Sequence, residues 1–189
     1  RNAIKIVNPL GEDTSVMRTS IIPSVLDVLS FNYNNRNEKA CLFEISKEYL
    51  PASEEKPFIN GNILANSGKE KHRYSYSLPD EPQRLTVGMY GGEADFYALK
   101  GMIEQLLGEM KIDGYEYIRA VDSDAFDEKF AFHPGRSAVI MRDGKALGIL
   151  GEIHPEVQET YGIGVKTYVA KLNIPELMES AAGKITYQP

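Results

Sequence analysis

One stretch near the N-terminus constrains the fold more than any other, because a long helical pattern is followed at once by a strand pattern that ends in proline. The stretch runs from residue 8 to Pro51. Ser20 is a suitable N-cap, since its hydroxyl can accept a hydrogen bond from an amide of the first helical turn. Pro23 falls inside that first turn, where its missing N–H costs nothing. The stretch therefore predicts a helix that begins near Ser20 and leads directly into a strand.

The apolar residues of this predicted helix recur at helical spacing and form a single stripe. The stripe consists of Ile22, Val25, Leu26, Leu29 and Tyr33. Offsets of about three, four, seven and eleven residues place side chains on one side of an α-helix. Periodicity alone leaves two interpretations open. The stripe is either buried on the chain's own core, or part of it packs on a partner chain.

The predicted strand has one fully apolar face. Cys41, Phe43 and Ile45 occupy alternate positions, and alternate residues of a strand point to the same side of a sheet. Cys41 is the single cysteine of the chain, so no internal disulfide can form, as is typical of a reducing cytoplasm. Its place in an apolar strand predicts a small buried side chain rather than a nucleophile.

The rest of the chain shows further strand and helix patterns separated by turn residues. Asp143-Gly144 is a strong hairpin signal, because glycine tolerates the positive φ that such turns require. Asp95 is the best N-cap candidate for a second long helix. The other predicted elements are strands at 1–7, 84–90, 115–121, 137–141, 146–150 and 166–172, and helices at 95–110, 155–161 and 174–180. Residues 1–180 are predicted to form one domain that contains a long loop at 52–82, and residues 181–189 a linker.

Composition narrows the classes of function. A chain of 189 residues that is 42% hydrophobic and 25% charged is typical of an ordinary globular domain. A net charge of −6, with no basic cluster beyond a short run at 69–73, argues against a domain that grips a long nucleic acid by itself. No apolar run approaches the ~20 residues that a membrane span needs. Because Arg1 stands where a complete chain has methionine, we expect a piece of a longer polypeptide.

Two histidine blocks are the strongest hints of chemistry. The first block contains His133 and Arg136, and the second contains Glu152 and His154. If the fold placed the blocks side by side, two imidazoles, a carboxylate and a guanidinium would come together. Two histidines and a glutamate could bind zinc, or could act as acid and base. However, the blocks lack the HExxH and CxxC spacings that make such sites specific. The sequence therefore assigns no catalytic residue and no metal ligand.

Taken in order, several blocks resemble a known family. They are SVMRTSIIPSVLDVLSFNYNNRNEKACLFEISKEYLP, then YGGEADFYALKGMIEQLL, then HPGR at 133–136 and GEIHP at 151–155. Together they are similar to the core of the bacterial phenylalanyl-tRNA synthetase beta subunit, over nearly the whole chain. The resemblance implies an α/β fold with a mainly antiparallel sheet flanked by helices, as in class II synthetase cores. In those cores a helix and a strand ending in proline, here at Pro51, build the subunit interface.

The resemblance also implies a role and a set of partners. In that family the alpha subunit activates phenylalanine with ATP and magnesium and charges the tRNA, and the beta core packs against it in a cytoplasmic (αβ)2 assembly. The partner-facing residues are then expected in the stripe of Ile22, Val25, Leu26, Leu29 and Tyr33. Transfer RNA is expected to reach this domain through the whole complex, with His133 and Arg136 as the candidates for a direct contact.

An active class II core must also grip ATP with arginines. The strand at 84–90 carries no arginine beyond its first residue, and the helix at 155–161 carries none. A guanidinium is hard to replace in bidentate recognition of phosphate. We therefore expect a non-catalytic domain that binds no cofactor itself. The alternative is a free-standing ATP-dependent ligase or amino-acid-binding enzyme on the same fold.

Overall fold

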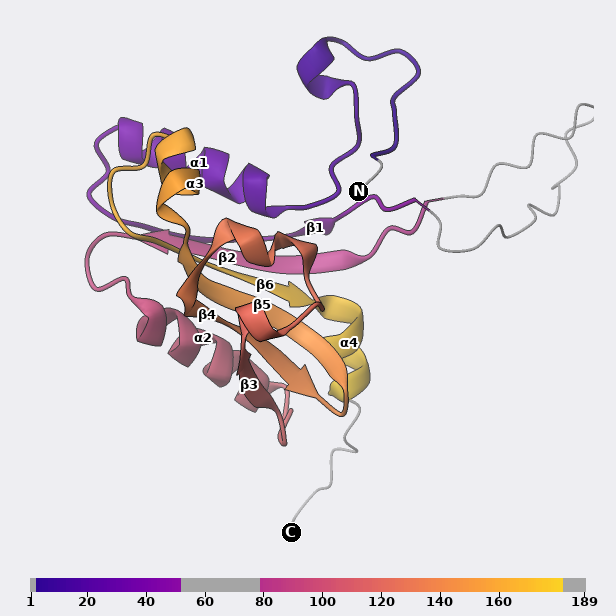
Figure 1. Ribbon diagram of the computed structural model, residues 1–189, viewed down its shortest axis with the longest axis vertical. Coiled ribbons are helices and arrows are strands. Elements are labelled where there is room, and N and C mark those ends of the chain that lie inside the picture. The colour runs from indigo at the N-terminus through magenta and orange to yellow at the C-terminus, as the bar shows by residue number, and fades with distance from the viewer. Residues whose placement is uncertain (1–2, 52–78, 182–189) are drawn as a thin grey trace, which may run out of the picture. The chain divides into compact units, whose positions relative to one another are not determined.

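The computed structural model describes residues 3–51 and 79–181 of the chain (Figure 1). They fall into two compact units, one formed by Arg1–Thr19 and Glu48–Glu81, the other by Ser20–Lys47 and Pro82–Pro189. Most of the predicted loop at 52–82 and all but the first residue of the predicted linker at 181–189 lie outside the described residues.

The described part of the smaller unit, residues 3–19, 48–51 and 79–81, contains little regular structure. A short 3₁₀ helix, η1 (Glu12–Thr14), lies between two backbone segments that meet in a single isolated bridge of Lys5 with Val16. The strand predicted at 1–7 is wrong over the described residues. Over residues 3–7 only Lys5 takes part in a bridge, and Val7 is almost fully exposed, so no neighbouring strand covers this segment in the described part of the chain.

The larger unit is built on one antiparallel sheet, which confirms the predicted fold class. Within the described residues the strand order is β1-β2-β6-β5-β4-β3, and every neighbouring pair is antiparallel. β1 and β3 are therefore the two edges of this sheet. The strands are β1 (Ala40–Lys47), β2 (Gln83–Tyr90), β3 (Glu116–Arg119), β4 (Phe132–Arg142), β5 (Lys145–Ile153) and β6 (Thr167–Asn173).

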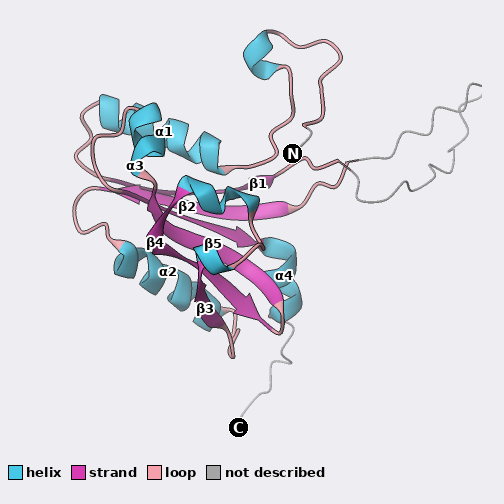
Figure 2. Cartoon of the chain, viewed as in Figure 1, coloured by secondary structure: helices cyan, strands magenta, loops and turns pink. Residues whose placement is uncertain are grey.

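Helices cover both faces of the sheet (Figure 2). They are α1 (Ile22–Asn34), α2 (Phe96–Glu109), α3 (Pro155–Thr160) and α4 (Ile174–Ser180), with 3₁₀ helices η2 (Ala120–Asp122) and η3 (Asp127–Ala131). One core cluster joins α1 and α3 to the first face, and a second joins α2 and α4 to the opposite face. None of the described helices has the length and apolar character needed to cross a membrane.

Several predicted turns and caps are confirmed at the level of single residues. Asp95 precedes α2, and its carboxylate accepts a hydrogen bond from the Ala98 amide at 2.6 Å. Asp143 and Gly144 both have positive φ between β4 and β5, as the hairpin signal predicts. Ser20 accepts from the Ile22 amide at 3.3 Å, although the cap position itself is one residue later, at Ile21.

Gly88 sets how closely α1 approaches the sheet. A Cβ atom at this position in β2 would lie 2.6 Å from Val25 Cγ1 and 2.9 Å from Leu29 Cδ1. Such distances are far inside van der Waals contact, so the helix rests directly on the glycine backbone. This face of the sheet is therefore filled by the side chains of α1.

Candidate functional site

The stripe predicted to meet a partner lies inside the chain's own core. Ile22, Val25, Leu26 and Leu29 are only 0–2% exposed. They belong to the core cluster that also contains Tyr90 and Val169 of the sheet. Tyr33 is half-buried, and its ring meets the Tyr90 ring edge-on at 5.8 Å. Ile22, Val25, Leu26 and Leu29 therefore match the other interpretation, burial on the chain's own sheet, and Tyr33 alone of the stripe keeps some exposed surface.

One stretch of exposed apolar surface lies along the edge strand β1, and single exposed apolar side chains also occur elsewhere, such as Phe31 on α1 and Phe130 in η3. Phe43 is 71% exposed and Ile45 is 57% exposed, on the face of the sheet that α2 also occupies. Cys41, on the same face, is exposed as well, so the prediction that it is buried is wrong. The physical reason is the reach of α2, which packs on β5 and β6 and leaves β1 uncovered.

These side chains line a shallow hollow of about 300 Å³. We call this surface the β1 groove and define it by Cys41, Phe43, Ile45, Leu85, Val87 and Met102. A second hollow of about 470 Å³ shares Cys41 and Met102 with it and continues toward Gly91. The residues of the β1 groove carry no charge, so it is suited to apolar side chains rather than to phosphate or a metal ion. Contiguous exposed apolar surface of this kind marks interaction sites.

The first histidine block forms a bulge in β4. Phe132 pairs with Ile153 and Ser137 with Gly151, so four residues stand opposite one residue of β5. Within the bulge, the His133 Nδ1 atom accepts from the Gly135 amide at 3.1 Å. The second histidine, His154, caps α3, where its Nδ1 atom accepts from the Glu156 amide. Both imidazoles are therefore engaged by nearby backbone.

Arg136 and Glu152 are brought together as the sequence suggested. Arg136 Nη1 donates to Glu152 Oε1 at 2.8 Å, and Glu152 is 3% exposed. Burial raises the pKa of Tyr168, and the neighbouring Glu152 carboxylate raises this pKa further. This arrangement neutralises a buried carboxylate and stabilises the bulge. The contact of His133 and Arg136 with tRNA stays a prediction. The salt dependence of tRNA binding would test it.

A buried ion pair on the α1 face of the sheet escaped the sequence analysis. Lys171 of β6 is 2% exposed, and its Nζ atom lies 2.6 Å from Glu128 Oε1 of η3. The only sequence signal was a lysine within an otherwise apolar strand. Because the two charges compensate each other, the pair fastens η3 to the sheet and leaves Lys171 poorly placed to bind an external anion.

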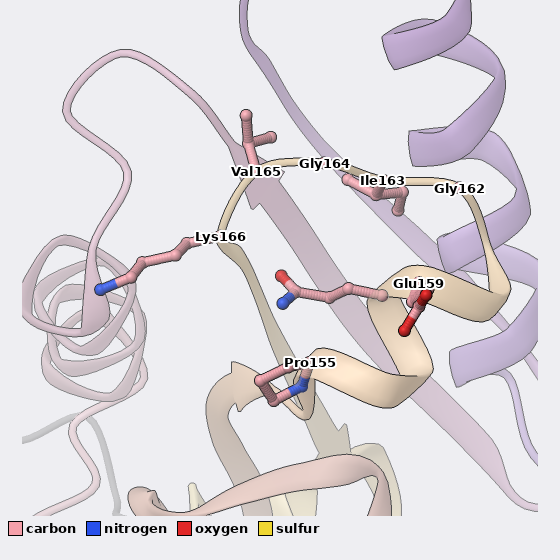
Figure 3. Close-up of a pocket in the computed structure, with 8 residues that line it drawn as sticks. Pro155, Glu159, Gly162, Ile163, Gly164, Val165 and Lys166 are labelled. Atoms are coloured by element: carbon pink, nitrogen blue, oxygen red, sulfur yellow. The ribbon is translucent and has the colours of Figure 1, made fainter.

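A pocket of about 480 Å³ with a mixed polar and apolar lining lies between α3 and the loop that leads into β6 (Figure 3). Gly162 follows the C-cap residue Tyr161 of α3 and has a φ of 65°, the left-handed conformation that favours glycine after a helix. Gly164 follows it, and a Cβ atom there would lie 2.7 Å from the Tyr33 hydroxyl. Among the described residues, no three His, Cys, Asp or Glu side chains are grouped as metal ligands, in this pocket or elsewhere.

Comparison with known proteins identifies relatives over the whole chain. The sequence model of the phenylalanyl tRNA synthetase beta chain CLM domain matches residues 1–174. The phenylalanine–tRNA ligase beta subunit of Clostridium tetani is 39% identical over 181 residues, covering 96% of this chain and 20% of the relative. That of Symbiobacterium thermophilum is 32% identical over 200 residues, covering 100% of this chain and 19% of the relative. The chain thus spans about a fifth of the length of these relatives.

Solved structures show the same fold at much lower identity. The crystal structure of pyrrolysyl-tRNA synthetase from Desulfitobacterium hafniense aligns with a TM-score of 0.59 and 11% identity, over 93% of this chain and 52% of that one. A second structure of that synthetase gives 0.59 and 14%, over 90% and 51%. At such identity the likeness concerns the fold alone, which is that of a class II synthetase core. The family itself is shown by the sequence model that matches residues 1–174: the chain belongs to the phenylalanyl-tRNA synthetase beta chain family.

Proposed function

We propose that this domain serves assembly rather than catalysis in a phenylalanine–tRNA ligase, and that it binds the alpha subunit through the β1 groove. The observation that carries the proposal is the exposure of Phe43 and Ile45 in a domain whose relatives are named as beta subunits. A subunit named beta implies an alpha partner. The predicted contact thereby moves from the buried stripe of α1 to the exposed face of β1.

Burial of the groove would supply a favourable free energy. Removing apolar surface from water stabilises a complex by roughly 25 cal/mol per Å². Obligate interfaces bury roughly 2,000 Å² or more, so the groove would be one apolar patch within a larger contact. The surrounding contact would include polar groups at the rim, as interfaces of this kind usually do.

The proposed absence of ATP binding has its own support. The side chains of α1 fill the sheet face above Gly88. On that same face the carboxylate of Glu128 neutralises the positive charge of Lys171. Arg84, the arginine at the start of the predicted strand, lies with Asn173 and Glu176 along a separate cleft. In this proposal ATP, magnesium and tRNA are handled by the whole cytoplasmic assembly. The alternative remains an ATP-dependent or amino-acid-binding enzyme on the same fold.

Calorimetry separates the two functions. Titration of the chain with ATP–magnesium and then with phenylalanine is expected to give no binding heat, whereas titration with the alpha subunit is expected to give a saturable one. The assembled alpha–beta complex, titrated with ATP under the same conditions, controls for the quality of the nucleotide. A measurable affinity of the isolated chain for ATP or phenylalanine would favour the enzyme instead.

A further inference from the structure

The cleft that Arg84 lines has a volume of about 510 Å³ and contains a buried asparagine with one unsatisfied atom. Asn173 lines this cleft and is 8% exposed. Its Nδ2 group donates to the Ala146 carbonyl at 2.7 Å, which fixes the orientation of the amide. The other end of the amide, Oδ1, is buried and has no hydrogen-bond partner in the described part of the chain. A buried acceptor without a donor is costly unless an external donor satisfies it.

A carboxylate oxygen in the same cleft is unsatisfied as well. Glu176 is in the first turn of α4 and lines the cleft, and its buried Oε2 atom has no hydrogen-bond partner among the described residues. The side chain as a whole is half-buried, so a small rotation brings this oxygen within reach of a ligand. Positions three apart at the start of a helix lie on the same side of it, so Asn173 and Glu176 present two acceptors to one cleft.

The other charged side chains of the cleft are already engaged. Lys145 Nζ lies 2.6 Å from Glu179 Oε1, and both of these side chains are exposed. Arg84 has an interaction partner of its own. Glu176 has no ion pair within residues 3–51 and 79–181, so it is the carboxylate that a ligand can compensate, and that ligand carries a positive charge. Because Arg84 lines the same cleft, a delocalised and weakly hydrated cation suits it better than a compact ammonium.

We propose that this cleft binds an arginine side chain. A guanidinium is planar and holds its N–H donors in a fixed fork, so it donates to Asn173 Oδ1 and to Glu176 Oε2 together. The apolar stem of the arginine packs on the remaining lining residues, which are Ala125, Ala146 and Pro175. None of these residues belongs to the β1 groove, so this inference goes beyond the proposed function and does not depend on the alpha subunit.

Blocked peptides of equal charge test the proposal. Acetyl-Gly-Arg-Gly-amide and acetyl-Gly-Lys-Gly-amide are titrated into the ¹⁵N-labelled chain while NMR follows the Asn173 side-chain NH₂ and the Glu176 backbone amide. The arginine peptide is expected to bind in the millimolar range, about 3-fold or more tightly than the lysine peptide, because only a guanidinium donates to both oxygens in one plane. Free L-arginine distinguishes the two sources of the ligand. Tighter binding of the peptide indicates an arginine carried by another protein, and tighter binding of L-arginine indicates the free amino acid.

The variant Glu176→Gln tests the charged acceptor. The change is nearly isosteric but replaces a charge-assisted hydrogen bond by a neutral one, and we expect about tenfold weaker binding of the arginine peptide. Glu156→Gln is the matched control, since Glu156 is exposed in the first turn of α3 and lies outside the cleft. The inference is overturned if millimolar arginine peptide leaves the Asn173 and Glu176 signals unmoved, or if the lysine peptide binds equally well. Equal binding by Glu176→Gln and Glu156→Gln would overturn it too.

Discussion

Replacement of Phe43 by glutamate is expected to abolish co-purification of the chain with the alpha subunit. Phe43 stands at the centre of the apolar face of β1 and is 71% exposed, so the chain itself should fold normally. In the complex the carboxylate would be buried against apolar surface without a partner, which is strongly unfavourable. Central aromatic residues of an interface typically contribute at least ~2 kcal/mol, or roughly a 30-fold change in affinity. Co-expression followed by affinity purification on a tagged alpha subunit measures the effect.

Phe130→Glu supplies the matched control for this experiment. Phe130 lies in η3 and is 79% exposed, but it is not part of the β1 groove. The same change of aromatic ring to carboxylate should therefore leave co-purification intact. If Phe43→Glu binds the alpha subunit as strongly as Phe130→Glu does, the groove is not the contact surface.

Leu29→Asp is expected to unfold the chain rather than to detach it selectively from a partner. Leu29 is fully buried between α1 and the sheet, where it also packs over Gly88. Even truncation to alanine at such a site costs about 2–5 kcal/mol, and an unpaired buried carboxylate costs more. Because domains of this size have only ~5–15 kcal/mol of stability, little folded protein should remain. Circular dichroism with urea denaturation measures the loss.

Val28→Asp places the same residue one position earlier on the same helix. It separates the destabilisation caused by burying aspartate from that caused by the low helix propensity of aspartate. Val28 is exposed, so this variant should stay folded with a urea midpoint close to that of the parent chain. A folded Leu29→Asp variant that has merely lost the alpha subunit would instead restore the stripe of α1 as a partner surface.

The sheet and its helices could be predicted because local signals agreed with the final packing. Four local signals each specify a conformation that the tertiary structure keeps. They are the alternation of apolar residues in β2, the helical spacing in α2, the cap at Asp95 and the turn at Asp143-Gly144. The strand expected at 1–7 failed because alternation of apolar residues does not show whether a neighbouring strand is present. The bulge in β4 was also missed, since its register depends on β5.

The candidate site was harder to predict, because exposure depends on which elements cover a surface. The sequence leaves the stripe of α1 either buried or partner-facing, and it predicts a buried Cys41 in the apolar face of β1. Only the structure shows that α1 lies on the sheet while α2 stops short of β1.

The most direct test uses Cys41, which lies in the β1 groove and is the single cysteine of the chain. Its rate of alkylation by iodoacetamide reports whether the groove is open, and mass spectrometry follows the reaction. If the domain binds the alpha subunit through β1, a saturating amount of cysteine-free alpha subunit should slow alkylation at least tenfold. Equal rates for the free chain and the alpha-bound chain would contradict this account.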